Sequence, residues 1–265
     1  MVQLSTRSIR QYLAPSNTMD TTTAISIFQI VIETLGRIQL AREFTDDFTA
    51  CQLKLDITQL RLSRWGEIAN ISTIDDAHHN TNGPGKGSTG NDPILAEVKE
   101  ILEGIQKHME LVQSEMSRLR RKITETDREV VEVDSSVQGD LKKIRNQFLK
   151  FLRKRELKVS KTIESIKWVF YKKDYFDKFI KSISERIQEL EETIPEADRE
   201  KFLKLSNEEC KGLGKSDLEV LKPIVGVCDP WLEESVNTEL GVARDGGECH
   251  QPVIQQRSCS WDTQR

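Results

Sequence analysis

The sequence has little of what marks secreted, membrane-spanning or metal-binding proteins. Its five cysteines include no Cys-x-x-Cys pair, so we expect neither a disulfide framework nor a zinc site, as in cytoplasmic proteins. No run of 18 apolar residues occurs, which argues against an ordinary transmembrane helix. Residues 1–20 carry two arginines but no apolar core or cleavage pattern, so they do not resemble a secretory signal.

Signs of catalysis are also scarce. The sequence lacks the Gly-x-Ser-x-Gly, His-Glu-x-x-His and dinucleotide-binding patterns, and "GPGKGST" at 83–89 lacks the spacing of a phosphate-binding loop. The histidines are isolated from cysteine or serine patterns that could activate them; they are His78, His79, His108 and His250. We therefore expect no enzyme, no catalytic residue, no cofactor, no metal ion and no small-molecule substrate.

The composition is that of a soluble protein with a substantial core. The chain of 265 residues is 37% hydrophobic and 31% charged, which suits one or two domains. Its formal net charge of −4 excludes a globally basic nucleic-acid binder, although it leaves room for local basic surfaces.

Apolar residues recur with helical spacing through most of the chain, and no alternation typical of strands appears. The pattern predicts helices over residues 21–41, 48–71, 94–123, 137–161, 162–171 and 173–194, and one or two short helices over 215–240. The predicted fold class is all-α, a compact multi-helix bundle with one long central helix pair.

The domain boundaries follow from composition. Residues 1–20 are expected to form a flexible leader, and 21–240 the bundle domain. A Gly-, Asn- and Pro-rich cluster at 75–92 predicts a loop inside that domain. Residues 241–265 show no periodicity, so we expect a disordered tail that folding does not need.

The stretch "CQLKLDITQLRLSRWGE" at 51–67 has two apolar faces. At 100° per residue, Cys51, Leu55, Leu62 and Trp65 share one face with Phe48, and a second set lies opposite; that set is Leu53, Ile57 and Leu60. The charged residues Lys54, Arg61 and Arg64 are placed along the flanks between the two faces. A helix with two apolar faces is expected to lie between layers of the bundle, with Trp65 buried.

A strongly basic amphipathic segment covers residues 141–161. Its candidate contacts with an anionic membrane are Lys142, Lys143, Lys150, Arg153, Lys154 and Lys158. The same pattern also fits a solvated face of a bundle helix. Binding of nucleic acid is a remote alternative, because no nucleic-acid reading motif accompanies the charge.

The segment 21–41 is apolar enough to suggest a second membrane element. It has no charge from Thr21 to Ile32, and Glu33 and Arg37 are spaced for an ion pair that would neutralise both. The candidate inserting residues are Ile25, Ile27, Phe28, Ile30, Val31, Ile32, Glu33 and Leu35. Ordinary packing against the central helix explains the pattern equally, and insertion would be strained.

The run from Cys51 to Glu67 resembles the signature of the fungal HeLo domain, found in HET-S-like prion-inhibition and propagation proteins. The signature and core positions are Cys51, Leu55, Asp56, Leu62, Arg64, Trp65 and Gly66. Lys161, Thr162, Trp168 and Tyr171 match a later segment of the family, and "DLEVLKPIVG" at 217–226 fits its last helices. The similarity covers roughly residues 20–240.

The resemblance implies a helical bundle that damages membranes. In such proteins the N-terminal apolar segment is held against the bundle and inserts on activation, in heterokaryon incompatibility or programmed cell death. Here residues 21–41 would take that role, membrane lipids would be the partner, and a cytoplasmic protein would move to the cell membrane. A homo-oligomer or another HeLo domain is a further expected partner.

This sequence departs from the family pattern in two ways. The apolar segment has Ile25, Phe28 and Glu33 where a glycine- and alanine-rich stretch is usual, and it begins some twenty residues into the chain. The tail contains no pair of amyloid repeats, so a trigger is expected to come from elsewhere. The alternative is a HeLo module that binds proteins without lysing membranes, in a regulatory or pathogenicity-related role.

Overall fold

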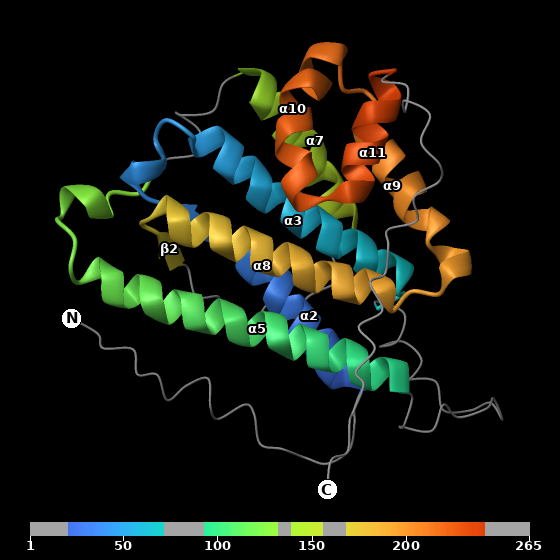
Figure 1. Ribbon diagram of the computed structural model, residues 1–265, viewed down its shortest axis with the longest axis horizontal. Coiled ribbons are helices and arrows are strands. Elements are labelled where there is room, and N and C mark those ends of the chain that lie inside the picture. The colour runs from blue at the N-terminus through green and yellow to red at the C-terminus, as the bar shows by residue number, and fades with distance from the viewer. Residues whose placement is uncertain (1–20, 72–92, 132–138, 156–167, 242–265) are drawn as a thin grey trace, which may run out of the picture.

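The computed structural model describes residues 21–71, 93–131, 139–155 and 168–241. These ranges form a bundle of α-helices (Figure 1), so the predicted fold class is confirmed. The helices are α2 (Thr21–Leu35), α3 (Phe48–Ile68), α5 (Pro93–Arg120), α7 (Gly139–Arg155), α8 (Lys173–Glu192), α9 (Glu200–Cys210), α10 (Lys215–Cys228) and α11 (Pro230–Glu239). Short 3-10 turns are η1 (Arg42–Phe44), η2 (Thr126–Arg128) and η3 (Glu196–Asp198). The predicted leader, the 75–92 loop and nearly all of the tail lie outside the described residues.

Helix α3 is the centre of the bundle. It packs against α2, α7, α8, α9 and α10, and most of its 21 residues are buried. Trp65, at 1% exposure, is buried as the two-faced pattern predicts. Because other helices surround α3 on nearly every side, polar residues of this helix are buried together with the apolar ones.

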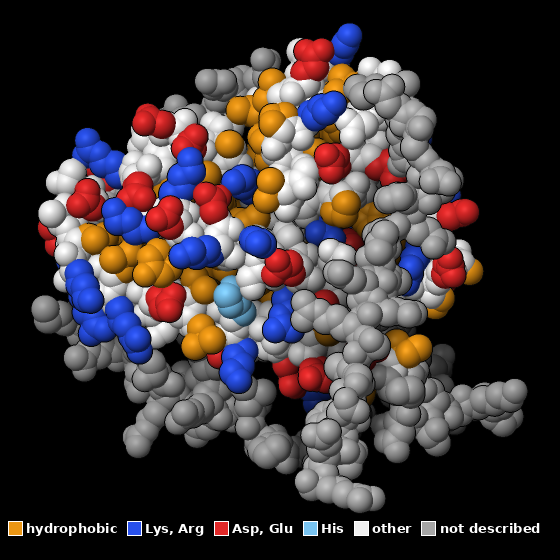
Figure 2. All heavy atoms as spheres, in the orientation of Figure 1, with side chains coloured by type: hydrophobic (Ala, Val, Ile, Leu, Met, Phe, Trp, Pro, Cys, Tyr) orange, Lys and Arg blue, Asp and Glu red, His pale blue; other side chains and the backbone are white. Residues whose placement is uncertain are grey.

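Helix α5 covers α2. Its 28 residues extend for about 42 Å at 1.5 Å per residue, and it packs against both α2 and α8 (Figure 1). The buried stripe of α5 has the expected spacing: Val98, Ile101, Leu102, Ile105, Met109, Val112 and Met116. Of the two long helices expected at the centre, α3 is central and α5 lies on the outside. The surface over α5 and α8 carries acidic and basic side chains side by side (Figure 2).

A small parallel sheet replaces parts of two helices that the sequence predicted. The helix predicted over 21–41 ends at Leu35, and residues Ile38–Leu40 form strand β1. The helix predicted over 162–171 is wrong at Trp168–Phe170, which forms strand β2 and pairs with β1 in register. Aromatic and β-branched residues in "WVF" favour a strand, but three residues are too few to show alternation.

The C-terminal helices complete the bundle around one end of α3. Residues 215–240 form the two short helices α10 and α11, and Asp229 caps α11 by accepting hydrogen bonds from the backbone N–H groups of Trp231 and Leu232. Helix α9 was not expected from the sequence. Its buried face includes Ser206 and Glu209, so the apolar stripe that would announce a helix is incomplete.

Candidate functional site

The candidate inserting residues of α2 lie on both its docked face and its flanks. The side chains of Ile25, Ile27, Phe28, Val31 and Leu35 are buried, whereas those of Ile30, Ile32 and Glu33 are half-buried. The guanidinium of Arg37 lies 3.5 Å from the Glu33 carboxylate, so these two residues form the ion pair that their spacing predicts. The apolar face that could enter a membrane is therefore the face that holds α2 to the bundle.

Phe28 fits into a notch on α3 formed by Trp65 and Gly66. The two aromatic rings lie 5.7 Å apart between centroids, at a tilt of 50°. A Cβ atom at Gly66 would come within 2.4 Å of Cζ of Phe28, so a larger residue at position 66 would collide with the ring. The signature glycine therefore shapes the surface against which α2 packs.

A polar contact fixes the far end of α2 on the same helix. The side-chain amide of Gln59 donates a hydrogen bond of 3.0 Å to the carbonyl of Ile32. This carbonyl is near the C-terminus of α2, where it also accepts a hydrogen bond of 3.3 Å from the backbone N–H of Gly36. Gln59 and Gly66 are seven residues apart on α3, so both ends of the docked face rest on one side of that helix.

The length of α2 sets a limit on what it can do alone. Its 15 residues measure about 22 Å, whereas the hydrocarbon core of a bilayer is about 30 Å thick. None of the helices in the described ranges is both long enough and apolar enough to cross a membrane.

The two signature arginines, which periodicity places on the flanks between the two apolar faces, are both buried. Arg64 is fully buried, and its guanidinium contacts the carboxylates of Glu209 at 2.6 Å and Asp229 at 2.9 Å. Arg61 is bidentate to Glu191, at 2.8 and 2.6 Å, and also donates to the carbonyl of Cys228. Glu191, near the C-terminal end of α8, is buried by this contact.

Burial and pairing compete in this cluster, and pairing decides the charge state. Burial lowers the pKa of Arg64, but the charges of Asp229 and Glu209 outweigh it and leave the pKa above its usual value. Burial raises the pKa of Asp229, but Arg64 and Arg61 bring the net value below 3.8. Arg64 and Asp229 are therefore ionised at neutral pH, and the ion pairs of the cluster hold α8, α9 and the start of α11 on α3.

Helix α7 divides its basic residues between two roles. Arg145 is paired with the buried Asp56 at 2.7 Å, and Arg155 is paired with both Glu67 and Glu209 at 2.5 Å. These two arginines stabilise the bundle. The residues predicted to contact anionic membranes lie on the opposite, exposed side: Lys142, Lys143, Lys150, Arg153 and Lys154. Lys158 lies outside the described residues.

The pKa of Asp56 is shifted in the opposite direction to that of Asp229. Burial raises its pKa above 3.8 despite the neighbouring charge and hydrogen bond of Arg145 and a further hydrogen bond from Gln52. Its ionised form is thus less favoured in the folded protein than in the unfolded chain. Asp56 is a signature residue of α3, and its buried ion pair with Arg145 joins α7 to α3.

Thiol and histidine chemistry finds no support in the described part of the chain. Burial raises the pKa of Cys51 to about 11, and those of Cys210 and Cys228 to about 12, so these thiols are protonated at neutral pH. His108 stacks on Phe179 in the contact of α5 with α8. Within the described ranges no group of three or more His, Cys, Asp or Glu side chains is placed to hold a metal ion.

The sequence identified the signature positions but not what they contact. Cys51, Leu55, Asp56, Leu62, Arg64, Trp65 and Gly66 are all buried. Their charged partners were missed, because Glu209 and Asp229 follow Arg64 by 145 and 165 residues. A local signal was the presence of two arginines on a helix with two apolar faces, where a buried charge needs a partner.

Comparison with known proteins agrees with this architecture. The HeLo family model, described as prion-inhibition and propagation, matches residues 21–223. Heterokaryon incompatibility proteins s and S of Podospora anserina are 25% and 26% identical to the chain over 214 residues, which is 79% of this chain and 68% of each relative.

The solved structure of the HET-s N-terminal domain has the same fold. It aligns with a TM-score of 0.71 and 24% identity over 83% of this chain and 97% of that domain. A doubly substituted form of that domain aligns with a TM-score of 0.70 over 82% of this chain. With a family model matching most of its length, the chain belongs to the HeLo family of prion-inhibition and propagation domains.

Proposed function

We propose that this protein is a latent membrane-active effector of the incompatibility or cell-death type. On activation α2 leaves the notch at Gly66 and enters a membrane. The observation that carries the proposal is the docking of α2: an apolar helix at one end of the domain, packed on a glycine-lined notch. The relatives named as heterokaryon incompatibility proteins support the biological setting.

Spanning a bilayer requires more length than α2 provides. Continuing the helix through Gly36, Arg37 and β1 would give residues 21–40 a length of about 30 Å, which matches the hydrocarbon core. Release of α2 and separation of β1 from β2 are therefore two parts of one transition. The Glu33–Arg37 pair reduces the charge that this segment carries into the membrane.

The exposed basic face of α7 is the proposed first contact with the membrane. Each lysine or arginine near an anionic leaflet contributes about 1 kcal/mol of attraction. Binding through α7 brings the protein from the cytoplasm to the inner face of the cell membrane. Membrane lipids are the partner in this scheme.

Dye release from anionic liposomes tests the proposal with variants of the notch. Gly66→Ala places a Cβ atom against Phe28, so it should loosen α2 and increase dye release. Gly104→Ala on α5 is the matched control, because a Cβ atom there meets only the exposed side chain of Arg186 from α8. The control should leak no more than the wild type.

Phe28→Lys separates release of α2 from its insertion. The buried lysine should weaken docking, but a charge within the inserting helix opposes entry by about 2.5–3.5 kcal/mol. This variant should therefore have a lower melting temperature without the leakage of Gly66→Ala. Equal leakage by Phe28→Lys and Gly66→Ala would show that α2 is not the inserting element.

A HeLo module that binds proteins without lysing membranes is the second candidate function. The observation in its favour is the firm docking of α2, which has aromatic, hydrogen-bonding and helix-packing contacts with α3 and α5. Absence of leakage from wild type and Gly66→Ala alike would establish this alternative in place of the first.

A further inference from the structure

The outward face of α7 is a uniform basic surface. The exposed side chains on this face are Lys142, Lys143, Asn146, Lys150, Arg153 and Lys154, and Gln147 beside them is half-buried. Their positions fall within a single arc of the helix at 100° per residue. This arc contains lysines, arginine and amides but no carboxylate, unlike the mixed charges over α5 and α8 (Figure 2).

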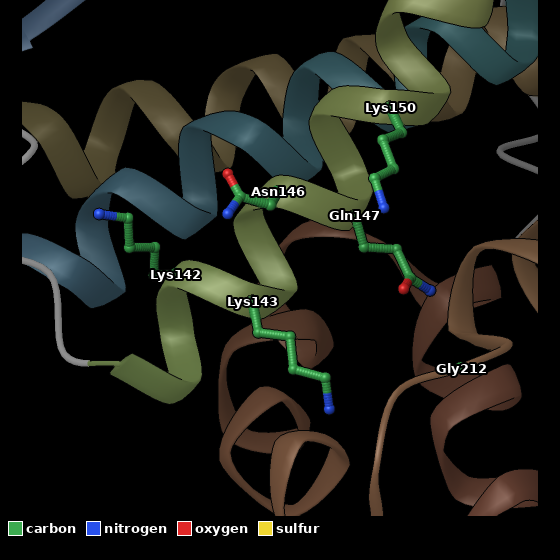
Figure 3. A pocket seen from close by; sticks show the side chains of 6 residues that line it. All are labelled: Lys142, Lys143, Asn146, Gln147, Lys150 and Gly212. Carbon is green, nitrogen blue, oxygen red and sulfur yellow. The ribbon is translucent and has the colours of Figure 1, made fainter.

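Part of this face is hollowed. A depression of about 500 Å³ is lined by Lys142, Lys143, Asn146, Gln147, Lys150 and Gly212. In Figure 3, α7 carries all the lining side chains, and the chain at Gly212 stands opposite Gln147. This volume is in the range of small-molecule sites, and the lysines and Asn146 supply hydrogen-bond donors to a negatively charged ligand.

The wall opposite α7 is fixed by hydrogen bonds. The Gln147 amide donates to the carbonyls of Glu209 and Lys211, at 2.6 Å each. Gly212 then takes a φ of +88°, which a residue with a side chain adopts at a cost. The two hydrogen bonds from Gln147 thus fix the bend between α9 and α10 beside the lysines of α7.

One lysine of the hollow is compensated, and two are not. Lys143 contacts the carboxylate of Asp217 at 2.5 Å, and the hydrogen bond from Lys143 keeps the pKa of that carboxyl low. Among the described residues, Lys142 and Lys150 have no acidic partner. The hollow therefore has excess positive charge that suits a compact ligand with more than one negative charge.

We propose that this hollow binds the phosphomonoester groups of a phosphorylated inositol headgroup. A phosphomonoester concentrates a charge of about −1.5 to −2 on three acceptor oxygens, and lysine binds it as a point charge. Single-stranded nucleic acid fits less well, since its recognition uses aromatic stacking and the lining has no aromatic side chain. The lipid source of the headgroup rests on the proposed membrane function; binding of the soluble headgroup does not.

Two variants of α7 separate a site from general charge attraction. Lys150→Glu reverses a charge in the hollow, and Lys154→Glu reverses an exposed charge one turn further along, outside the lining. Soluble inositol 1,4,5-trisphosphate is titrated calorimetrically into the full chain. Lys150→Glu should weaken binding by about tenfold or more, and Lys154→Glu by no more than about threefold.

Vesicles then identify the source of the headgroup. Binding to vesicles with phosphatidylinositol 4,5-bisphosphate is compared with binding to phosphatidylserine vesicles of equal surface charge, and Lys150→Glu should abolish the preference for the former. Equal losses in the two variants, no binding of the soluble headgroup, or stronger competition by a single-stranded oligonucleotide or a phosphopeptide would each overturn the inference. Dye release is not measured here, so failure of the lytic proposal leaves this result intact.

Discussion

Single residues of the signature have different tasks. Gly66 leaves room for Phe28, whereas Arg61 and Arg64 attach the C-terminal helices to α3. The periodicity of the sequence was enough to predict the burial of Trp65, because apolar spacing is a local property of a helix. Periodicity was not enough to predict the burial of Arg64, because the burial of a guanidinium depends on carboxylates supplied by α9 and by the cap of α11.

Removing the charge of Arg64 should be strongly destabilising. Arg64→Met keeps much of the volume but leaves Asp229 and part of Glu209 buried without their partner, and we expect a loss of about 3–5 kcal/mol in unfolding free energy. The measurement is urea unfolding followed by circular dichroism. Arg153→Met, on the exposed face of α7, is the control and should change stability by about 0.5 kcal/mol or less. Similar stabilities for the two variants would contradict the proposed role of the buried cluster.

At the scale of elements, the long helices were predictable and the short pieces were not. The 28 residues of α5 repeat their apolar spacing many times, whereas β1 and β2 have three residues each. Strand formation there depends on pairing between segments far apart in sequence. The same reason explains α7: its pattern showed a basic amphipathic helix, but only the packed structure separates Arg145 and Arg155 from the exposed lysines.

The pairing of β1 with β2 should act as a second restraint on α2. Gln39 and Val169 are paired in register and are both half-buried, so cysteines at these positions have a geometry suited to a disulfide. In a background with Cys249→Ser and Cys259→Ser, the oxidised Gln39→Cys/Val169→Cys protein should release no dye from anionic liposomes. Reduction should restore release to the level of the Gln39→Cys control. Release by the fully oxidised protein would show that β1 stays paired during membrane entry.

At the scale of the whole molecule, α3 separates two regions with different chemistry. On one side α2 packs through an apolar face and a glycine notch; on another, α8, α9 and α11 attach through buried ion pairs. Apolar contacts respond little to pH, whereas ion pairs respond strongly. Acid is therefore expected to loosen the C-terminal helices before it affects the docking of α2.

The carboxylates Asp229 and Asp56 should contribute to stability with opposite dependence on pH. The pKa of Asp229 is below 3.8 in the folded protein, so its stabilising contribution is complete above pH 3.8 and is lost as the pH falls further. The pKa of Asp56 is above 3.8, so the folded protein gains stability from protonating Asp56 as the pH falls through the raised pKa towards 3.8. The contribution of Asp229 therefore changes below pH 3.8, whereas that of Asp56 changes above pH 3.8.

Urea unfolding of the wild type, Asp229→Asn and Asp56→Asn between about pH 3 and pH 7 measures both contributions. The destabilisation caused by Asp229→Asn should be largest at neutral pH and should shrink below pH 3.8. Relative to Asp56→Asn, the wild type should instead become more stable as the pH falls towards 3.8, because the asparagine lacks the proton uptake of Asp56. Each unit by which a folded pKa departs from its ordinary value changes the unfolding free energy by about 1.4 kcal/mol. Curves of the same sign for both variants would mean that Arg145 outweighs the burial of Asp56, and that the contact of α7 with α3 behaves like the Arg64 cluster.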